Sequence, residues 1–307
     1  MASKKTGLQT RLQKIPGLIG VIHLPPLGGS PGARDLHPAE ALQKAGLWAV
    51  REAQALTRAG FEAIILENFG DIPFYKDHVP PETIASLSVI AAAVREATDL
   101  PLGINVLRND ARSALAIAAV TGCEFIRVNI LSGVAATDQG WIDANAAELI
   151  RERNRLGVDV AILADAHVKH AKTFSSDDLE LAIEELALRA GADGVIITGS
   201  TTGRFVEREQ LERASRVSRR HQIPVFVGSG STVETLPEIV QAGIGVIVGS
   251  ALRKGGKAAQ ILDLKRTRDF VKAYRLAVRE ALKGKSPVQE SSKKPVRKKP
   301  VLKKRKA

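Results

Sequence analysis

Two glycine-rich stretches, PVFVGSGS at residues 224–231 and GVIVGSALRKGG at residues 245–256, indicate both the fold and a ligand site. Each contains a short run of Val, Ile or Phe, which is typical of a strand buried on both faces. Gly228, Gly230 and Gly249 then let backbone amides approach an anion, because no Cβ stands in the way. Barrels of eight parallel strands commonly bind phosphate at the loops after strands seven and eight, beside a helix N-terminus. We therefore predict that these two turns together hold a phosphate group.

Working outward from these turns, short apolar runs alternate with stretches of helical spacing along the whole chain. Eight strands are expected at residues 18–22, 63–66, 102–106, 125–130, 158–163, 194–197, 225–227 and 246–248. Helices are expected at residues 38–59, 81–98, 109–121, 141–156, 177–190, 207–221, 232–242 and 258–282. Parallel strands need such long crossovers, so the pattern predicts a (β/α)8 TIM barrel, with a doubly wound open sheet as the alternative.

Glycines and capping signals mark the ends of several expected helices. The residues Gly60, Gly122, Gly157, Gly191 and Gly243 stand just before the next strand, where a left-handed residue ends a helix. Ser231 and Glu234 have the spacing of a capping box at the start of helix 232–242. These signals support the alternation of helix and strand.

Length and charge suggest one folded domain with basic flanks. With 307 residues and 44% hydrophobic content, the chain can build one large core. Of the net charge of +12, residues 283–307 carry +10, from eleven Lys and Arg against one Glu, and residues 1–14 carry +4, which leaves −2. We therefore expect a barrel at 15–282, a flexible N-terminus at 1–14 and a disordered Lys/Pro-rich tail at 283–307. The tail is either a weak contact for nucleic acid or anionic membrane, or a solvated extension.

The single cysteine, Cys123, argues against a disulfide framework, and we interpret it as a buried bystander. Basic residues interrupt the start of the chain, and no apolar stretch is long enough for a signal or membrane segment. We expect a cytoplasmic protein, with peripheral contact to a membrane through its tail as the alternative to a fully solvated tail.

Polar residues follow most of the expected strands, at the end that faces the mouth of such a barrel. They are His23, Glu67, Asn68, Asn105, Asn129, Asp165, His167 and Thr198. Together they predict a polar pocket for a small molecule, in which Asn68, Asn105, Asn129 and Thr198 contact the ligand. Each of them by itself is also consistent with a structural hydrogen bond.

The segment after the fifth strand, ADAHVKHAKTFSSDD, contains the groups best suited to acid–base catalysis. A carboxylate can orient an imidazole, so we predict that Asp165 positions His167, with Lys169 or Glu67 as partner and His23 nearby. The same carboxylates and imidazoles also allow a divalent metal, although no metal-ligand spacing supports one.

The predicted phosphate ligands are backbone amides of three turns. They are Gly199, Ser200, Gly228, Ser229, Gly230, Ser231, Gly249 and Ser250. The loop after the second strand holds Phe69, Phe74 and Tyr75, an unusual concentration in a chain with 4% aromatic residues. We interpret this loop as a binding or assembly surface, and expect a homo-oligomer.

Several long segments, in order, resemble the BtpA family over about residues 15–280. They are GVIHLPPLGGSPG, ENFGDIPFYKDHVPPET, INVLRND, FIRVNILSG, HVKHA, DGVIITGSTTG, PVFVGSGST and VIVGSALRKGG. The resemblance implies a barrel of the ribulose-phosphate-binding type, and the naming member is associated with photosystem I biogenesis. Two functions follow: an isomerase, lyase or hydrolase acting on a sugar or nucleoside phosphate, or a non-catalytic assembly factor for membrane complexes.

Overall fold

The computed structural model describes residues 17–167, 171–173, 178–199, 206–228 and 230–284. The expected flexible N-terminus at 1–14 and nearly all of the expected tail at 283–307 therefore lie outside the described residues. The last helix, α9, runs to Gly284, two residues beyond its predicted end.

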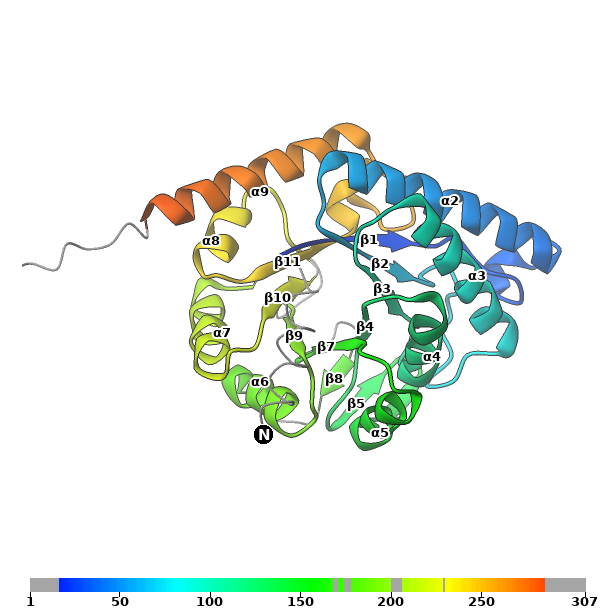
Figure 1. Cartoon of the computed structure of the whole chain (residues 1–307), viewed down its shortest axis with the longest axis horizontal. Helices are drawn as coiled ribbons and strands as arrows, with labels where there is room; N and C mark the ends of the chain where they lie inside the picture. Colours follow the sequence, from blue (N-terminus) through cyan, green and yellow to red (C-terminus); the bar gives the residue numbers. More distant parts are fainter. Residues whose placement is uncertain (1–16, 168–170, 174–177, 200–205, 229, 285–307) are drawn as a thin grey trace, which may run out of the picture.

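Eight parallel strands close into a barrel, seen end-on in Figure 1. They are β1 (Leu18–His23), β2 (Ala63–Glu67), β3 (Leu102–Asn105), β4 (Phe125–Val128), β7 (Ala161–Asp165), β9 (Gly194–Ile197), β10 (Val225–Gly228) and β11 (Gly245–Val248). Their order around the barrel is β1-β11-β10-β9-β7-β4-β3-β2, and β1 pairs with both β2 and β11. The predicted TIM barrel is confirmed, and the open-sheet alternative is wrong because that pairing leaves no edge strand.

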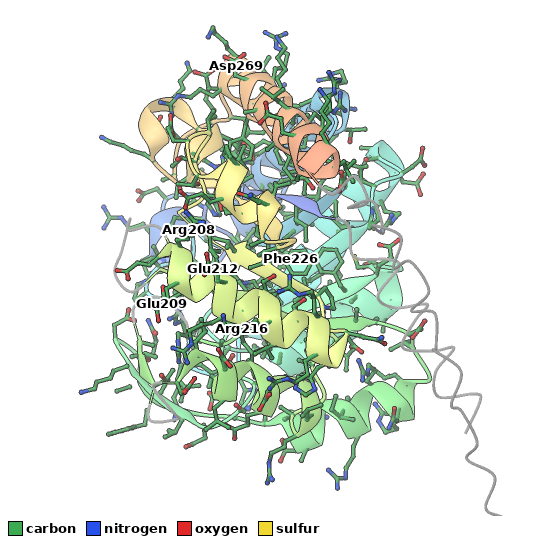
Figure 2. The ribbon with its side chains drawn as sticks, turned by 90° about the vertical axis from the view of Figure 1, so that its left-hand side faces the viewer. Arg208, Glu209, Glu212, Arg216, Phe226 and Asp269 are labelled. Atoms are coloured by element: carbon green, nitrogen blue, oxygen red, sulfur yellow. The ribbon has the colours of Figure 1, made fainter. Side chains whose placement is uncertain are left out.

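An outer ring of helices surrounds the barrel (Figure 1). It comprises α2 (Pro38–Ala59), α3 (Pro81–Ala97), α4 (Ala111–Thr121), α5 (Ala146–Leu156), α6 (Leu179–Leu188), α7 (Arg208–His221), α8 (Leu236–Gln241) and α9 (Leu264–Gly284). The five predicted helix-ending glycines all have left-handed backbone, with φ between 66° and 95°. Figure 2 shows α7 presenting charged side chains such as Arg208 and Glu212 outward, while Leu211 and Ala214 are buried against the barrel.

A small antiparallel sheet, which the sequence analysis missed, stands apart from the barrel. It pairs β5 (Val134–Thr137) with β6 (Gly140–Asp143) and with β8 (Ala171–Thr173). Because β6 occupies residues 140–143, α5 begins at Ala146 instead of near residue 141. Ala135 and Ile142 bury this sheet over Ile130, just after β4.

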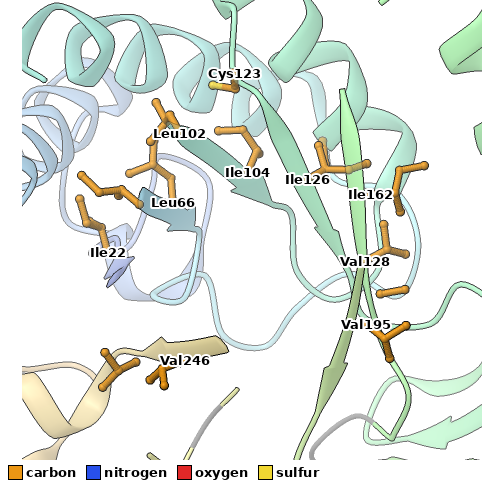
Figure 3. Close-up of a cluster of buried hydrophobic side chains, with 14 of the residues drawn as sticks. Ile22, Leu66, Leu102, Ile104, Cys123, Ile126, Val128, Ile162, Val195 and Val246 are labelled. Atoms are coloured by element: carbon orange, nitrogen blue, oxygen red, sulfur yellow. The ribbon is translucent and has the colours of Figure 1, made fainter. Parts of the chain in front are cut away.

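Two apolar layers stabilise the barrel. The larger lies between the outward-facing strand residues and the helices, and Figure 3 shows part of it, including Ile104, Ile126 and Cys123. The smaller fills the barrel interior, where Phe125 and Phe226 are wholly or almost wholly buried. Gly103 makes room for Phe125, because a Cβ there would overlap the phenyl ring. The described interior side chains therefore form a packed apolar floor beneath the polar mouth of the barrel.

In the part of the chain that the structure describes, no helix is long and apolar enough to cross a membrane.

Candidate functional site

The period of two along each strand sets which polar residues point into the barrel mouth. Val21 and Ile65 belong to the apolar floor, so the next inward positions on β1 and β2 are His23 and Glu67. By the same rule, Asn105, Asn129 and Asp165 point inward at or just beyond the ends of β3, β4 and β7. Most of these side chains line a cavity of about 270 Å³ at the carboxyl ends of the strands.

The cavity is lined by residues of β1, β2, β3, β4 and β11, and by residues of the segments that follow β2, β3, β4, β10 and β11. They are Val21, His23, Glu67, Phe69, Phe74, Asn105, Leu107, Arg108, Arg127, Asn129, Gly230, Ser231, Ile247, Val248, Gly249, Ser250, Ala251 and Ala258.

Arg127 ties the polar groups of the mouth together from β4. Its Nε and Nη2 donate to the two oxygens of Asp165 at 3.2 and 3.0 Å, and its Nη1 donates to Glu67 Oε1 at 3.1 Å. Asn129 Nδ2 adds a third donor to Asp165 at 2.6 Å, and Asn105 Nδ2 donates to Glu67 at 3.0 Å. This geometry, with three donors on one carboxyl, is that of an ionised carboxylate held by a bidentate guanidinium.

Burial and charge act in opposite directions in this network. Burial alone would lower the pKa of Arg127, but the adjacent carboxylates of Asp165 and Glu67 outweigh it and raise that pKa. Burial also raises the pKa of Asp165, against the effect of Arg127 and Asn129. The Asp165 side chain is fully buried, so the arginine is what makes its charge tolerable there.

His23 is held as a neutral imidazole with one free lone pair. Its Nδ1 lies 3.1 Å from the carbonyl oxygen of Ala258, which can only accept, so Nδ1 carries the proton. Burial, with Arg253 and Arg127, lowers the pKa of His23, while Glu67 opposes the shift. Its Nε2 lies 3.7 Å from Glu67 Oε2, and its ring packs at 4.5 Å from the ring of Phe69. At neutral pH, Nε2 is therefore a base at the cavity wall.

The turns after β10 and β11 lie side by side, because these two strands are paired at Gly228 and Ile247. Gly230 has left-handed backbone, with φ of 91°, and lines the cavity with Ser231, Gly249 and Ser250. Gly249 touches the site closely: a Cβ there would lie 2.9 and 3.1 Å from ring atoms of His23. Among the described residues, no loop hydrogen bond to a backbone carbonyl uses the amides of Gly230, Ser231 or Ser250.

Among the buried polar atoms of the cavity wall, Asn129 Oδ1 and Ser231 Oγ have no hydrogen-bond partner within the described residues. Their residues are 3% and 2% exposed. A buried polar group without a partner is costly, and a ligand or water commonly satisfies it.

The predicted capping box is wrong, because α8 begins at Leu236 and Ser231 does not cap it.

Comparison with known proteins identifies the family, because residues 14–275 match the sequence model of the BtpA family. The chain belongs to the BtpA family. It is 42% identical over 273 residues to the photosystem I biogenesis protein BtpA of Synechocystis, covering 87% of this chain and 90% of that protein. A relative from Pyrococcus horikoshii is 44% identical over 255 residues, which is 83% of this chain and 94% of the relative.

Solved structures share the barrel at low identity. Dihydropteroate synthetase with its product gives a TM-score of 0.53 at 13% identity, covering 88% of this chain and 94% of that one. Thiamine phosphate pyrophosphorylase from Pyrococcus furiosus gives a TM-score of 0.50 at 18% identity, covering 88% and 98%. Likeness at these identities shows the fold alone.

Several residues predicted for the site lie beside the cavity of this BtpA-family barrel instead of lining it. Thr198 Oγ1 donates to the carbonyl of Gly228 at 2.6 Å, which joins the ends of β9 and β10. Asn68 accepts from the amide of Leu107 at 2.8 Å and donates to Asp71 at 3.0 Å. Gly199 is half-buried, and the cavity lining does not include it.

The predicted pairing of Asp165 with His167 stays a prediction. His167 is half-buried just beyond β7, outside the cavity lining, and the oxygens of Asp165 accept from Arg127 and Asn129. The three further predicted residues Lys169, Ser200 and Ser229 lie outside the described residues.

The suggested divalent metal gains no support. Among the described residues, no group of three His, Cys, Asp or Glu side chains is placed to hold a metal ion. Arg127 bridges Glu67 and Asp165, the two carboxylates named for such a site, and supplies positive charge there.

Three arginines of the BtpA-family site were not predicted from the sequence. Arg127 lies two residues before Asn129 on a buried strand. Because side chains alternate along a strand, this spacing places Arg127 on the same inward face as Asn129, and the sequence alone could have shown it. Arg108 is 7% exposed and lines the cavity, and burial lowers its pKa. Arg253 is fully buried and pairs with Glu52 of α2 at 2.8 Å, which anchors the segment after β11. No local pattern marks Arg253, because its partner lies 201 residues away.

Proposed function

We propose that this barrel binds a phosphorylated small molecule at its mouth and moves a proton on it. The observation that carries the proposal is a single cavity shared by the glycine turns after β10 and β11 and by His23, Glu67 and Asn129. An anion-binding wall and a proton-transfer wall thus face one small volume.

The phosphate is held by the turns in this proposal. The amides of Gly230, Ser231 and Ser250 donate to phosphate oxygens, and Ser231 Oγ gains the partner it lacks within the described residues. Arg108 lines the same cavity and adds positive charge without requiring a metal ion. The phosphate-binding enzyme named thiamine phosphate pyrophosphorylase has the same type of barrel, which agrees with the proposal without deciding it.

The acid–base pair is His23 with Glu67. The unprotonated Nε2 of His23 faces the cavity beside Glu67 Oε2, and Arg127 fixes the other oxygen of Glu67. His23 accepts a proton from the ligand, and Glu67 stabilises the imidazolium that forms. Proton abstraction next to a carbonyl is common to isomerases and aldolase-type lyases, so these reaction classes fit better than ester hydrolysis.

Binding is tested by thermal shift with a panel of phosphate monoesters, because a ligand that binds the folded state raises the unfolding temperature. Ser231→Ala should weaken the shift about tenfold in apparent affinity, whereas Ser88→Ala on α3, whose hydroxyl donates within its own helix, should not. If no phosphorylated compound shifts the wild-type protein, the proposal fails.

Proton transfer is tested by incubating a bound compound in D2O and following deuterium incorporation by NMR. His23→Gln should abolish incorporation while the compound still binds. Retained incorporation in this variant would remove His23 from the proposed role.

A second function, assembly of membrane complexes, is favoured by the name of the Synechocystis relative. Under this alternative the basic segment 283–307 makes the contact, and the cavity is dispensable. Deleting 285–307 would then abolish a cellular phenotype that Asp165→Asn and His23→Gln leave intact. The reverse pattern supports the enzyme.

A further inference from the structure

A second cavity of about 340 Å³ adjoins the first and shares Phe74 and Leu107 with it. Five of its twelve lining residues are prolines or aromatic residues from the loops after β1 and β2: Pro31, Pro73, Phe74, Tyr75 and Pro80. The first cavity, at about 270 Å³, is small for a complete organic ligand. A ligand larger than a sugar phosphate must therefore extend over Phe74 into the second cavity.

The first cavity reaches across the barrel mouth from the turn at Gly230 to the loop at Leu107, and the second cavity adjoins it on the Leu107 side. Around the barrel, three strands lie between β10 and β3 in either direction, so the turn at Gly230 faces the loop at Leu107 across the opening. Between them lie two groups that accept hydrogen bonds, Asn129 Oδ1 and the Glu67 carboxylate. A ligand that fits this order has a phosphate at one end, donors such as hydroxyl groups in the middle, and a different group at the far end.

The chemistry of the second cavity indicates what that far group is. Three of its polar side chains already bond within the protein: Asp71 accepts from the amide of Leu27 and from Asn68, and Ser30 Oγ donates to the carbonyl of Leu27. A second sugar would therefore find few free partners there. Flat proline and aromatic walls instead favour a planar ring, which gains most from stacking.

The shape of the second cavity is fixed by hydrogen bonds that do not involve the rings of Phe74 and Tyr75. The amide of Arg108 donates to the carbonyl of Tyr75 at 3.0 Å, and the amide of Val79 donates to Asp110 at 2.9 Å. Asp110 also caps α4 through Ser113. The aromatic loop is thus fixed to the start of α4, so ligand binding need not order it.

We propose that the second cavity binds the planar base of a nucleoside phosphate whose phosphate lies at the Gly230 turn. This inference rests on the proposed function and chooses the nucleoside phosphate over the simple sugar phosphate. The exposed Tyr75, at 59%, is then the residue that the base covers.

The test is isothermal titration of the full chain with ribose 5-phosphate and with purine and pyrimidine nucleoside 5′-monophosphates. We expect at least one nucleotide to bind about tenfold more tightly than ribose 5-phosphate, from stacking of one base. Tyr75→Ala should remove most of that gain and leave ribose 5-phosphate binding unchanged. Ser231→Ala should weaken both ligands. Leu188→Ala, a 63% exposed apolar residue near the C-terminal end of α6, is the matched surface control.

The outcomes separate the two proposals. If ribose 5-phosphate and every nucleotide bind equally, or Tyr75→Ala has no selective effect, the base cleft is wrong and the phosphate site stands. If neither class of ligand binds, the proposed function fails and this inference fails with it.

Discussion

Replacing Arg127 by methionine should expose how much the barrel mouth depends on one buried cation. The substitution keeps the length and apolar stem of the side chain but removes both donors to Asp165 and the donor to Glu67. The side chains involved are 13%, 0% and 7% exposed, so water cannot replace the guanidinium. Breaking a buried pair in this way costs about 3–5 kcal/mol. For a domain of this size that corresponds to a fall of roughly 10 °C in Tm.

The loss should depend on pH in a defined direction. Burial already raises the pKa of Asp165 above the ordinary 3.8. Removing Arg127 takes away the positive charge that lowers this pKa most, so the pKa rises further. The folded variant then binds this proton more tightly than the unfolded chain does. Its stability is therefore highest below the unfolded pKa and declines as pH rises through the raised folded pKa. Relative to wild type, Arg127→Met should be less destabilised at about pH 5 than at about pH 8.

Urea denaturation at both pH values measures these differences. Arg155→Met is the matched control, because Arg155 pairs with Glu152 at the surface with a 66% exposed side chain, and it should unfold with wild type. Adding Asp165→Asn to Arg127→Met should recover part of the stability and remove the pH dependence. The reasoning is refuted if Arg127→Met unfolds like the control, or loses the same stability at both pH values.

Three further outcomes are expected. Gly249→Ala should weaken phosphate-ester binding at least tenfold, because the new Cβ meets the His23 ring. Gly46→Ala on α2, where a Cβ meets no neighbour, should keep binding. Equal binding by both variants would contradict the close approach of Gly249 to His23. In an NMR titration, with the resonance assigned through His23→Gln, His23 should titrate below 6.5, since burial lowers its pKa; a midpoint above that value would mean a protonated imidazole. Burial raises the pKa of the Cys123 thiol, so a thiol reagent should react with it slowly in the native protein and rapidly after denaturation; fast native reaction would place it at the surface.

Much of the fold could be predicted because its signals are local. The strand runs and the left-handed glycines before them recur at regular intervals, and each depends only on neighbouring residues. The β5–β6 hairpin was missed because its strands have four residues each, a length at which strand and helix patterns are not distinguishable. The start of α8 was misplaced by four residues, since a serine and a glutamate at capping spacing need not cap a helix.

For the site, the position at a strand end predicted His23, Glu67, Asn105 and Asn129 as cavity residues. Side chains alternate between the two faces of a strand, so the sequence shows which of them point into the barrel. The partners of these residues were not predictable. Arg127 joins Glu67, 60 residues before it, to Asp165, 38 residues after it. Arg253, in the segment after β11, pairs with Glu52 of α2.

The sequence by itself therefore determined the barrel, the positions of its turns and the polar character of its mouth, because backbone conformation and side-chain direction are set within a few residues. Only the tertiary structure decided which of these polar groups pair, which remain free to meet a ligand, and which cavities adjoin. Those properties depend on distances between strands far apart in sequence, and on the burial that makes an unpaired charge or hydroxyl costly.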